Sequence, residues 1–501
     1  MHVNPETLFL DNPLLTKHLR SRLRPGQVVP TGLVILVLCL LMAWMGYLNR
    51  GFSDGSVYSM TMALQGIVLV IIGASQISGS VGGVRETGIL DFHRISPVPP
   101  VVITTGFFLG APVREYLLCA LVMPLSAYCA SQGYPGWGDW FQSEALLILL
   151  AWVFHGLALL SSLMTKKPKA NSWGVVIFLV IMFMYGGSFV FSMARGGIPQ
   201  PEYRFYGVEL PWFAFFAIYF VSAIVFLLIA STRKMRSERA HALAKPQAVV
   251  FLSTVAVLAL GGVWSLDLDA LPVVVLYGLV LASLPAMISI TPLAGDYARG
   301  LRRAERAGDR HLPPWHDLAL NRLTVGVLCL IVLVGASVAA QVLDKPPQFG
   351  PIDYTRGINL AIAVGVFVVA YFGLAYQFFA FTAPKRAGTM MALFLFFAWV
   401  VPLLAAGIAG LSNMSEKVTV SLMSLSPIFG LATSAGALPN PDFLYYAQLS
   451  ALLPAIGFAF LFNNLVTVYR RRLERATIDP AELVRKDRAF DPFATEEALE
   501  G

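Results

Sequence analysis

A few polar or ionisable side chains lie inside long runs of apolar residues, where such groups are rare. In chain order they are Gln65, Gln76, Arg114 and Glu115 (at the inner end of the third run), His155, Gln377, Asn463 and Asn464. An unpaired ionisable group inside a bilayer costs roughly 3 kcal/mol, so such groups often mark the pathway of a substrate or proton. The alternative role, more common for glutamine and asparagine, is hydrogen bonding between helices. His155, Gln65 and Gln377 are therefore candidate pathway residues.

Motifs for nucleotide or metal chemistry are absent from the sequence. Only His155 among the seven histidines lies in an apolar run, so an intramembrane histidine–metal site is not expected. The dipeptide Gly-Lys never occurs, which excludes the phosphate-binding loop of common ATPases. The four cysteines all fall inside apolar runs and are interpreted as small hydrophobic residues. We therefore expect no metal, no cofactor and no enzymatic activity in this chain.

The composition is that of an integral membrane protein. Of the 501 residues 57% are hydrophobic and only 13% are charged, against about 25% charged residues in soluble proteins. The formal charge of +7 does not require a nucleic-acid partner, because cytoplasmic loops of membrane proteins collect lysine and arginine. Nucleic acid is therefore not expected among the partners, whereas membrane lipids are.

Twelve apolar runs are long enough to be membrane spans, which need roughly 20 residues each. They cover residues 31–48, 57–77, 113–130, 144–164, 173–193, 211–230, 248–263, 271–290, 323–342, 358–381, 389–409 and 446–468. With the N-terminus inside, 30 of the 36 lysines and arginines fall in inner segments and six in outer segments. This asymmetry follows the positive-inside rule and predicts that both termini are cytoplasmic.

The two halves of the chain share a layout. Each has six runs, and the longest inner loop of each half, 80–112 and 291–322, lies between its second and third runs. An even number of spans restores the same orientation, so the repeat is predicted to be parallel. The expected organisation is a first half at 1–240, a second half at 241–470 and a cytoplasmic tail at 471–501. The expected fold is an all-α polytopic membrane protein.

Two short helices are predicted outside the spans. Residues 12–24 form a basic amphipathic pattern in which leucines and His18 would face lipid while lysine and arginines meet phosphates. In the loop 80–112, Ile89, Phe92 and Ile95 recur on one side of a short helix that Pro97 ends. Asp91 and Arg94 share another side of that helix. A helix of this kind either docks on a partner protein or lies on lipid.

These segments resemble the permeases of type-2 ABC exporters. The stretch NPLLTKHLRSRLRPG is similar to the family's surface helix before the first span. The stretch VRETGILDFHRISPVPP matches the pattern of its first cytoplasmic loop at Arg85, Glu86, Gly88, Leu90 and Pro97, and Gly110 stands near the start of the following helix. The segment LSPIFGLATS before the last run is also similar. In the second half the likeness is mainly one of layout, with Asp296, Tyr297 and Arg299 in a comparable place.

The resemblance implies a permease in which two six-span halves are fused and a separate ATPase subunit docks on the cytoplasmic loops. Its expected docking residues are Arg85, Glu86, Gly88, Ile89, Asp91, Phe92, Arg94, Asp296 and Arg299. In the first loop, the rim charges would be Arg85, Glu86, Asp91 and Arg94, and the apolar anchor would be Ile89, Phe92 and Ile95. The expected cargo is an apolar or amphipathic small molecule or lipid, exported across a bacterial cytoplasmic (inner) membrane. The alternatives are a twelve-span secondary transporter of another fold, which would bury carboxylates at mid-membrane, and a non-transporting anchor or regulatory subunit.

Overall fold

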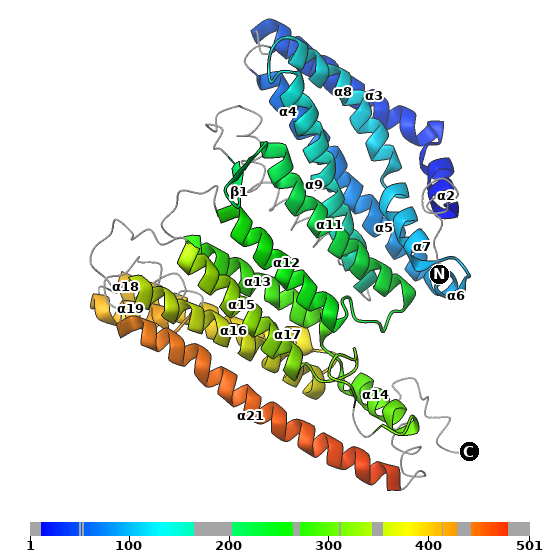
Figure 1. Cartoon of the computed structure of the whole chain (residues 1–501). Helices are drawn as coiled ribbons and strands as arrows, with labels where there is room; N and C mark the ends of the chain where they lie inside the picture. The colour runs from blue at the N-terminus through cyan, green and yellow to red at the C-terminus, as the bar shows by residue number, and fades with distance from the viewer. Residues whose placement is uncertain are drawn as a thin grey trace. The chain divides into compact units, whose positions relative to one another are not determined.

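The computed structural model describes residues 12–49, 52, 55–164, 203–263, 271–309, 312–342, 354–412, 414–427 and 442–478. The predicted span at 173–193, part of the segment LSPIFGLATS and the end of the tail lie outside these residues. The chain divides into two compact units, Met1–Leu243 and Ala244–Gly501. Figure 1 shows that both units are built almost entirely of helices.

Unit 1 contains the short surface helices and the first group of long helices. Its elements are α2 (Pro13–Arg22), α3 (Pro25–Asn49), α4 (Ser56–Gly66), the π-helical segment η1 (Ile67–Ile72), α5 (Gly73–Glu86), α6 (Ile89–Ile95), α7 (Pro100–Gly110), α8 (Val113–Ser131), α9 (Trp137–Met164), β1 (Tyr203–Phe205), β2 (Val208–Leu210) and α11 (Trp212–Arg236). Strands β1 and β2 pair antiparallel as a small hairpin, which the all-α prediction did not include.

Unit 2 contains the remaining helices. Its elements are α12 (Lys245–Val263), α13 (Leu271–Ile290), α14 (Ala294–Arg306), α15 (Arg322–Val342), α16 (Tyr354–Thr382), α17 (Ala387–Leu395), the π-helical segment η2 (Phe396–Val400), α18 (Val401–Leu411), α19 (Glu416–Ser424) and α21 (Asp442–Ile478). Helix α21 therefore continues for several residues beyond 471, where the polar tail was expected to begin.

Ten helices in the described part of the chain are long and apolar enough to cross a membrane. The count becomes eleven if the pair Val274–Ile290 and Ala294–Arg306, which is bent by 58°, is one span. The chain is thus a polytopic helical membrane protein, as the sequence predicts. The parallel six-span repeat and the cytoplasmic location of both termini stay predictions.

The third span is longer than expected. It runs from Pro100 to Ser131 and comprises α7 and α8, whereas the prediction began it at Val113. Proline is tolerated in the first turn of a helix, so the Pro99-Pro100 pair opens α7 instead of only ending α6. At about 1.5 Å per residue, its 32 residues are longer than the roughly 30 Å hydrocarbon core. Arg114 and Glu115 consequently lie near the middle of this span and not at its inner end.

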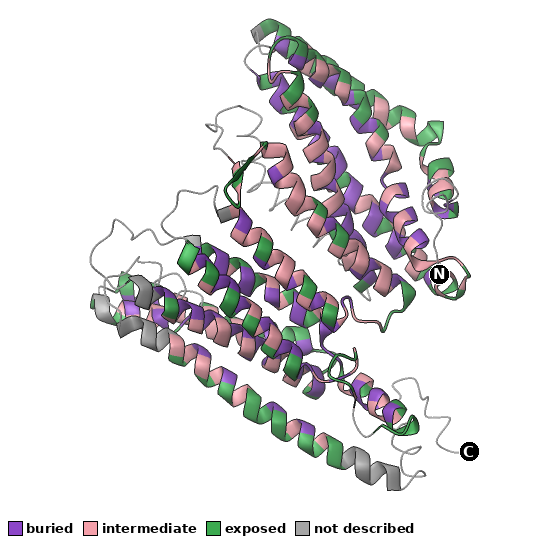
Figure 2. Cartoon of the chain, viewed as in Figure 1, coloured by how far each residue is buried: buried purple, intermediate pink, exposed green. Residues whose placement is uncertain are grey.

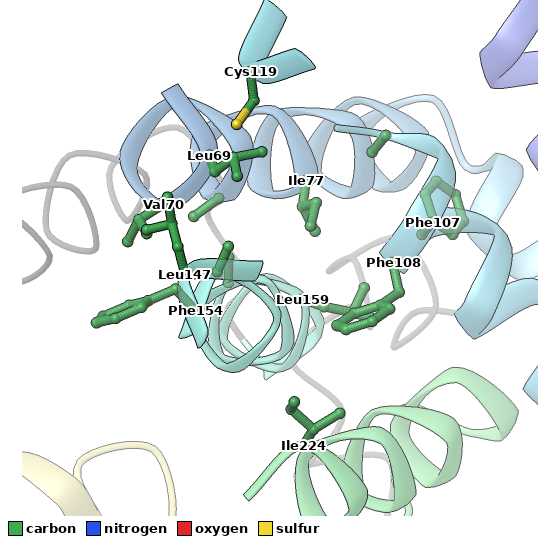
Figure 3. Packing of buried hydrophobic residues seen from close by; sticks show 14 of the residues in the cluster. Leu69, Val70, Ile77, Phe107, Phe108, Cys119, Leu147, Phe154, Leu159 and Ile224 are labelled. Carbon is green, nitrogen blue, oxygen red and sulfur yellow. The ribbon is translucent and has the colours of Figure 1, made fainter. Parts of the chain in front are cut away.

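The core of unit 1 forms around the continuous helix Ser56–Glu86, which comprises α4, η1 and α5. Figure 3 shows side chains of this helix, α7, α8, α9 and α11 packing together, among them Leu69, Ile77, Phe107, Phe108, Cys119, Leu147, Phe154, Leu159 and Ile224. Figure 2 shows a contrast between this buried helix and α3, most of whose residues are exposed. Because its exposed side chains are apolar, α3 is suited to face lipid.

Helix α2 is fixed to the protein and not to lipid alone. The Asn12 side chain caps it by accepting from the amides of Leu14 and Leu15, and donates to the Val102 carbonyl of α7 at 2.8 Å. A Cβ atom at Gly106 would lie 2.6 Å from the Leu14 Cβ, so glycine permits this close approach. The expectation that Leu14 and His18 face lipid is therefore wrong, because both are buried by the protein.

Candidate functional site

Helix α6 has one buried side and one exposed side. Gly88, with φ of +72°, turns the chain before the helix in a conformation that favours glycine, and Ser96 ends it with an extended backbone. Leu90 is 1% exposed and belongs to the core of unit 1, whereas Phe92 is 65% and Ile95 is 82% exposed. Ile89 is also exposed. The apolar anchor predicted from the sequence thus lies outward on a helix that Leu90 holds in place.

Two of the expected rim charges face the protein. Arg85, with a 15% exposed side chain, bonds Glu238 at 2.5 Å and the carbonyls of Ser162 and Leu163 at 3.3 Å. Arg94 is 12% exposed and bonds Asp91 at 2.7 Å. The interpretation of Arg85 and Arg94 as rim charges is therefore wrong. They attach α5 and α6 to the ends of neighbouring helices, while Glu86 and Asp91 remain exposed at the surface.

Arg94 also joins α6 to the end of α11. Its guanidinium donates to the carbonyls of Lys234 and Met235 at 3.4 Å, and lies 4.0 Å from Glu238. Carbonyls at a helix C-terminus lack partners within the helix and carry a partial negative charge, which favours a cation there. A force applied to α6 would therefore reach α11 directly.

The second predicted docking residues lie on α14 of unit 2. Asp296 and Arg299 form an ion pair within one turn of this helix. Tyr297 between them is buried and packs in a cluster with Phe381 and Phe462. The exposed side of α14 is therefore charged and lacks the bulky apolar anchor of α6.

His155 has a complete set of hydrogen-bond partners. Its Nε2 lies 2.9 Å from the Leu69 carbonyl in η1, and its Nδ1 lies 3.2 Å from the Tyr116 hydroxyl. Trp152 Nε1 donates to the same hydroxyl at 3.1 Å. These contacts fit a neutral imidazole that donates from Nε2 to the π-helical backbone and accepts at Nδ1. A π-helical segment leaves the regular helical hydrogen-bond ladder, so His155 supports the backbone at that point.

Gln65 and Gln377 contact different buried groups. Gln65 Nε2 donates to both oxygens of Glu144 at 3.1 Å. The Ser126 hydroxyl donates to the same carboxylate at 3.0 Å, and Glu144 is buried in α9. In unit 2, Gln377 accepts from the Asn321 amide at 3.1 Å and so fixes the loop before α15.

Unit 1 holds more buried charge than the sequence suggested. Besides Glu144, the fully buried Glu115 pairs with Arg114 at 2.7 Å near the middle of the third span. The other carboxylate oxygen of Glu115 has no hydrogen-bond partner among the described residues. Glu115 and Glu144 therefore lie farther inside their helices than the apolar runs predict, because these candidate spans begin at Pro100 and Trp137.

Two histidines flank the Phe107 ring where α2, α6 and α7 meet. The ring centroid of Phe107 lies 5.5 Å from that of His18 and 6.4 Å from that of His93. Burial, together with the charges of Arg22 and Lys17, lowers the pKa of His18 to about 4. Burial and Lys17 also lower the pKa of His93. Both imidazole rings are therefore neutral at pH 7, which suits their contact with the apolar ring of Phe107.

We expect the junction of α2 with α7 to weaken in acid. The folded-state pKa of His18 is below its unfolded value, so its contribution is complete above about pH 6.5 and is lost as pH falls toward 4. Between pH 7 and pH 5 the melting temperature should fall by about 3 °C more for the wild type than for His18→Phe, which cannot titrate. Thermal unfolding in detergent measures this, and equal pH dependence of the two proteins would contradict it.

No family model, curated protein or solved structure matches this chain. Within the described residues, no three His, Cys, Asp or Glu side chains are grouped so that they could hold a metal ion. The features of the described chain that bear on function are therefore α6, α14 and the buried carboxylates.

Proposed function

We propose that the chain is the transmembrane permease subunit of an ABC exporter, driven by a separate ATPase subunit that docks on its cytoplasmic loops. The observation that supports this most is the two-sided helix α6. Leu90, Arg85 and Arg94 attach this region to the bundle, while Phe92 and Ile95 stay exposed. An exposed apolar pair on a rigidly attached short helix is suited to insert into a groove of a partner. The sequence likeness to type-2 exporter permeases, at Arg85, Glu86 and Gly88, agrees with it.

In this proposal the subunit resides in a bacterial cytoplasmic membrane and exports an apolar or amphipathic molecule. ATP hydrolysis occurs in the partner, because the chain has no phosphate-binding loop. Motion of the partner reaches α11 through Arg94 and the carbonyls of Lys234 and Met235. Arg85 links the same movement to the end of α9 through Ser162 and Leu163.

Co-expression of the full chain with a candidate Walker-motif ATPase from the same genome tests this function. The full chain and the ATPase should co-purify from membranes, and ATP turnover by the complex in proteoliposomes should exceed that of the ATPase alone. An amphipathic fluorescent dye should leave cells, and enter inverted vesicles, only when ATP is present. A chain that purifies without any such ATPase, and transports dye without ATP, would contradict the proposal.

A second candidate function is ion-coupled secondary transport, which the buried carboxylates favour. Glu144 is held by Gln65 and Ser126, and Glu115 by Arg114, all inside candidate spans. Membrane-buried carboxylates often carry protons or cations in transporters. The same side chains could instead serve as fixed contacts between helices.

The variant Glu144→Gln separates these two roles. Glutamine keeps the shape of the side chain and one accepting oxygen for Gln65 and Ser126, but it cannot titrate in the relevant range. If Glu144 carries protons, dye efflux driven by a pH gradient without ATP should fall at least tenfold. The matched control is Glu209→Gln, which alters an exposed carboxylate of the β-hairpin. If the chain is an ATPase-driven exporter, the wild type should show no efflux driven by a pH gradient. Strong efflux of this kind that Glu144→Gln abolishes would favour ion-coupled transport instead.

A further inference from the structure

Helix α14 carries four arginines on one side. Arg302 and Arg303 are adjacent, and each lies three or four residues from Arg299 and from Arg306, which places all four along one side of the helix. The opposite side is buried and includes Tyr297, Gly300 and Ala304. Arg299 is paired with Asp296, whereas Arg303 and Arg306 are exposed and have no ion pair among the described residues. Glu305 is exposed too, but helical spacing places it beside the arginine row and not on it.

The end of α21 adds two more arginines to this surface. Arg470 Nε donates to the Tyr297 hydroxyl of α14 at 2.9 Å, and the Tyr469 hydroxyl donates to the Ala294 carbonyl at 3.1 Å. Arg302 interacts electrostatically with Tyr469. Arg470 and the adjacent Arg471 are both exposed. The two helices, both labelled in Figure 1, therefore form one basic surface within unit 2.

The sequence of exposed residues along α21 indicates the depth of this surface. Up to Leu461 the large exposed side chains are apolar, namely Leu449, Leu453, Ile456, Phe460 and Leu461. Asn463, Asn464 and Thr467 are exposed in the next two turns, followed by Val468. The half-buried Tyr469 and the exposed Arg470 and Arg471 come next, and tyrosine and arginine are residues that membrane helices place at the boundary between hydrocarbon and headgroups. Because Arg470 bonds Tyr297, the first turns of α14 lie at the same boundary.

We propose that Arg302, Arg303, Arg306, Arg470 and Arg471 form a binding site for the phosphate groups of anionic phospholipids. A guanidinium offers two parallel donors to a phosphate and is more weakly hydrated than an ammonium group. Clusters of basic residues next to a membrane helix attract anionic lipid in proportion to their number. The site is independent of ATPase docking on α6. The exposed arginines of α14 thereby add a contact with the membrane surface to the ATPase docking expected at Asp296 and Arg299.

The test measures stabilisation of the purified full chain by added lipid. Dioleoylphosphatidylglycerol should raise the melting temperature of the wild type in detergent, whereas dioleoylphosphatidylcholine and inorganic phosphate should not. In Arg303→Glu/Arg306→Glu the half-maximal concentration of the anionic lipid should rise at least tenfold. Native mass spectrometry should show fewer retained anionic lipids, and higher salt should weaken the wild-type effect.

The matched control is Lys385→Glu/Arg386→Glu, which reverses two exposed charges of the same unit at the turn before α17. It should change the half-maximal concentration less than threefold. If Arg303→Glu/Arg306→Glu folds poorly, Arg303→Gln/Arg306→Gln takes its place with the same expected direction. An unchanged lipid response, an equal loss in the control, or equal stabilisation by phosphate would overturn the proposal. Unchanged lipid binding with lost ATPase association would assign α14 to protein docking instead.

Discussion

Replacing Phe92 and Ile95 together by aspartate is expected to weaken association with the ATPase subunit at least 100-fold. Both side chains are mostly exposed on α6, so in the complex they would supply most of the apolar surface that enters the partner. Loss of one central aromatic or aliphatic anchor typically weakens binding by about 2 kcal/mol or more. The loss of two anchors therefore exceeds about 2.7 kcal/mol, the binding free energy that corresponds to a 100-fold change in Kd. Binding of the purified ATPase to the full chain in nanodiscs measures the effect.

Controls for this double variant come from the same helix. Phe92→Leu/Ile95→Val keeps apolar surface and should lose less than about tenfold. The melting temperature of the aspartate variant should stay within about 1 °C of wild type, because Leu90 holds α6 in place and the altered side chains are exposed. Unimpaired ATPase binding by the aspartate variant would remove α6 from the docking surface and the main support for the proposed function.

Substitution of Lys245 by methionine is expected to destabilise unit 2 by about 3 kcal/mol. Lys245 is fully buried at the start of α12, and its Nζ donates to three carbonyls of the loop before α15. The carbonyls belong to Pro314, Ala319 and Leu320, at 3.1, 2.7 and 3.2 Å. Methionine fills similar space but leaves them without this donor, and each buried carbonyl left unpaired costs about 1–3 kcal/mol.

The loop that Lys245 holds follows α14, so the loss should also loosen the α14 region. Hydrogen exchange of residues 312–321 should accelerate in Lys245→Met, together with a drop of several degrees in melting temperature. Lys385→Met removes an exposed lysine from the same unit and should change neither measurement. Equal behaviour of the two variants would show that the three carbonyls do not depend on the ammonium group.

Much of the fold could be predicted because the relevant signals are local. Long apolar runs predict spans, since a bilayer requires continuous helices of sufficient length. Gly88 and the prolines after Ile95 bound α6, and the recurrence of Ile89, Phe92 and Ile95 predicts its exposed apolar side. The spacing of the arginines in α14 carries the same kind of local signal, although no helix was predicted at 294–306.

What only the tertiary structure decided is which charges face the protein and how deep they lie. Arg85 bonds Ser162 and Glu238, which lie 77 and 153 positions away in the sequence, and Gln65 bonds Glu144, which lies 79 positions away. Glu115 was predicted at the end of a span but lies near its middle, because the span begins at Pro100 and not at the start of the apolar run. The periodicity of a sequence shows which residues share a side of one helix, whereas burial and pairing depend on the other helices that pack against that side.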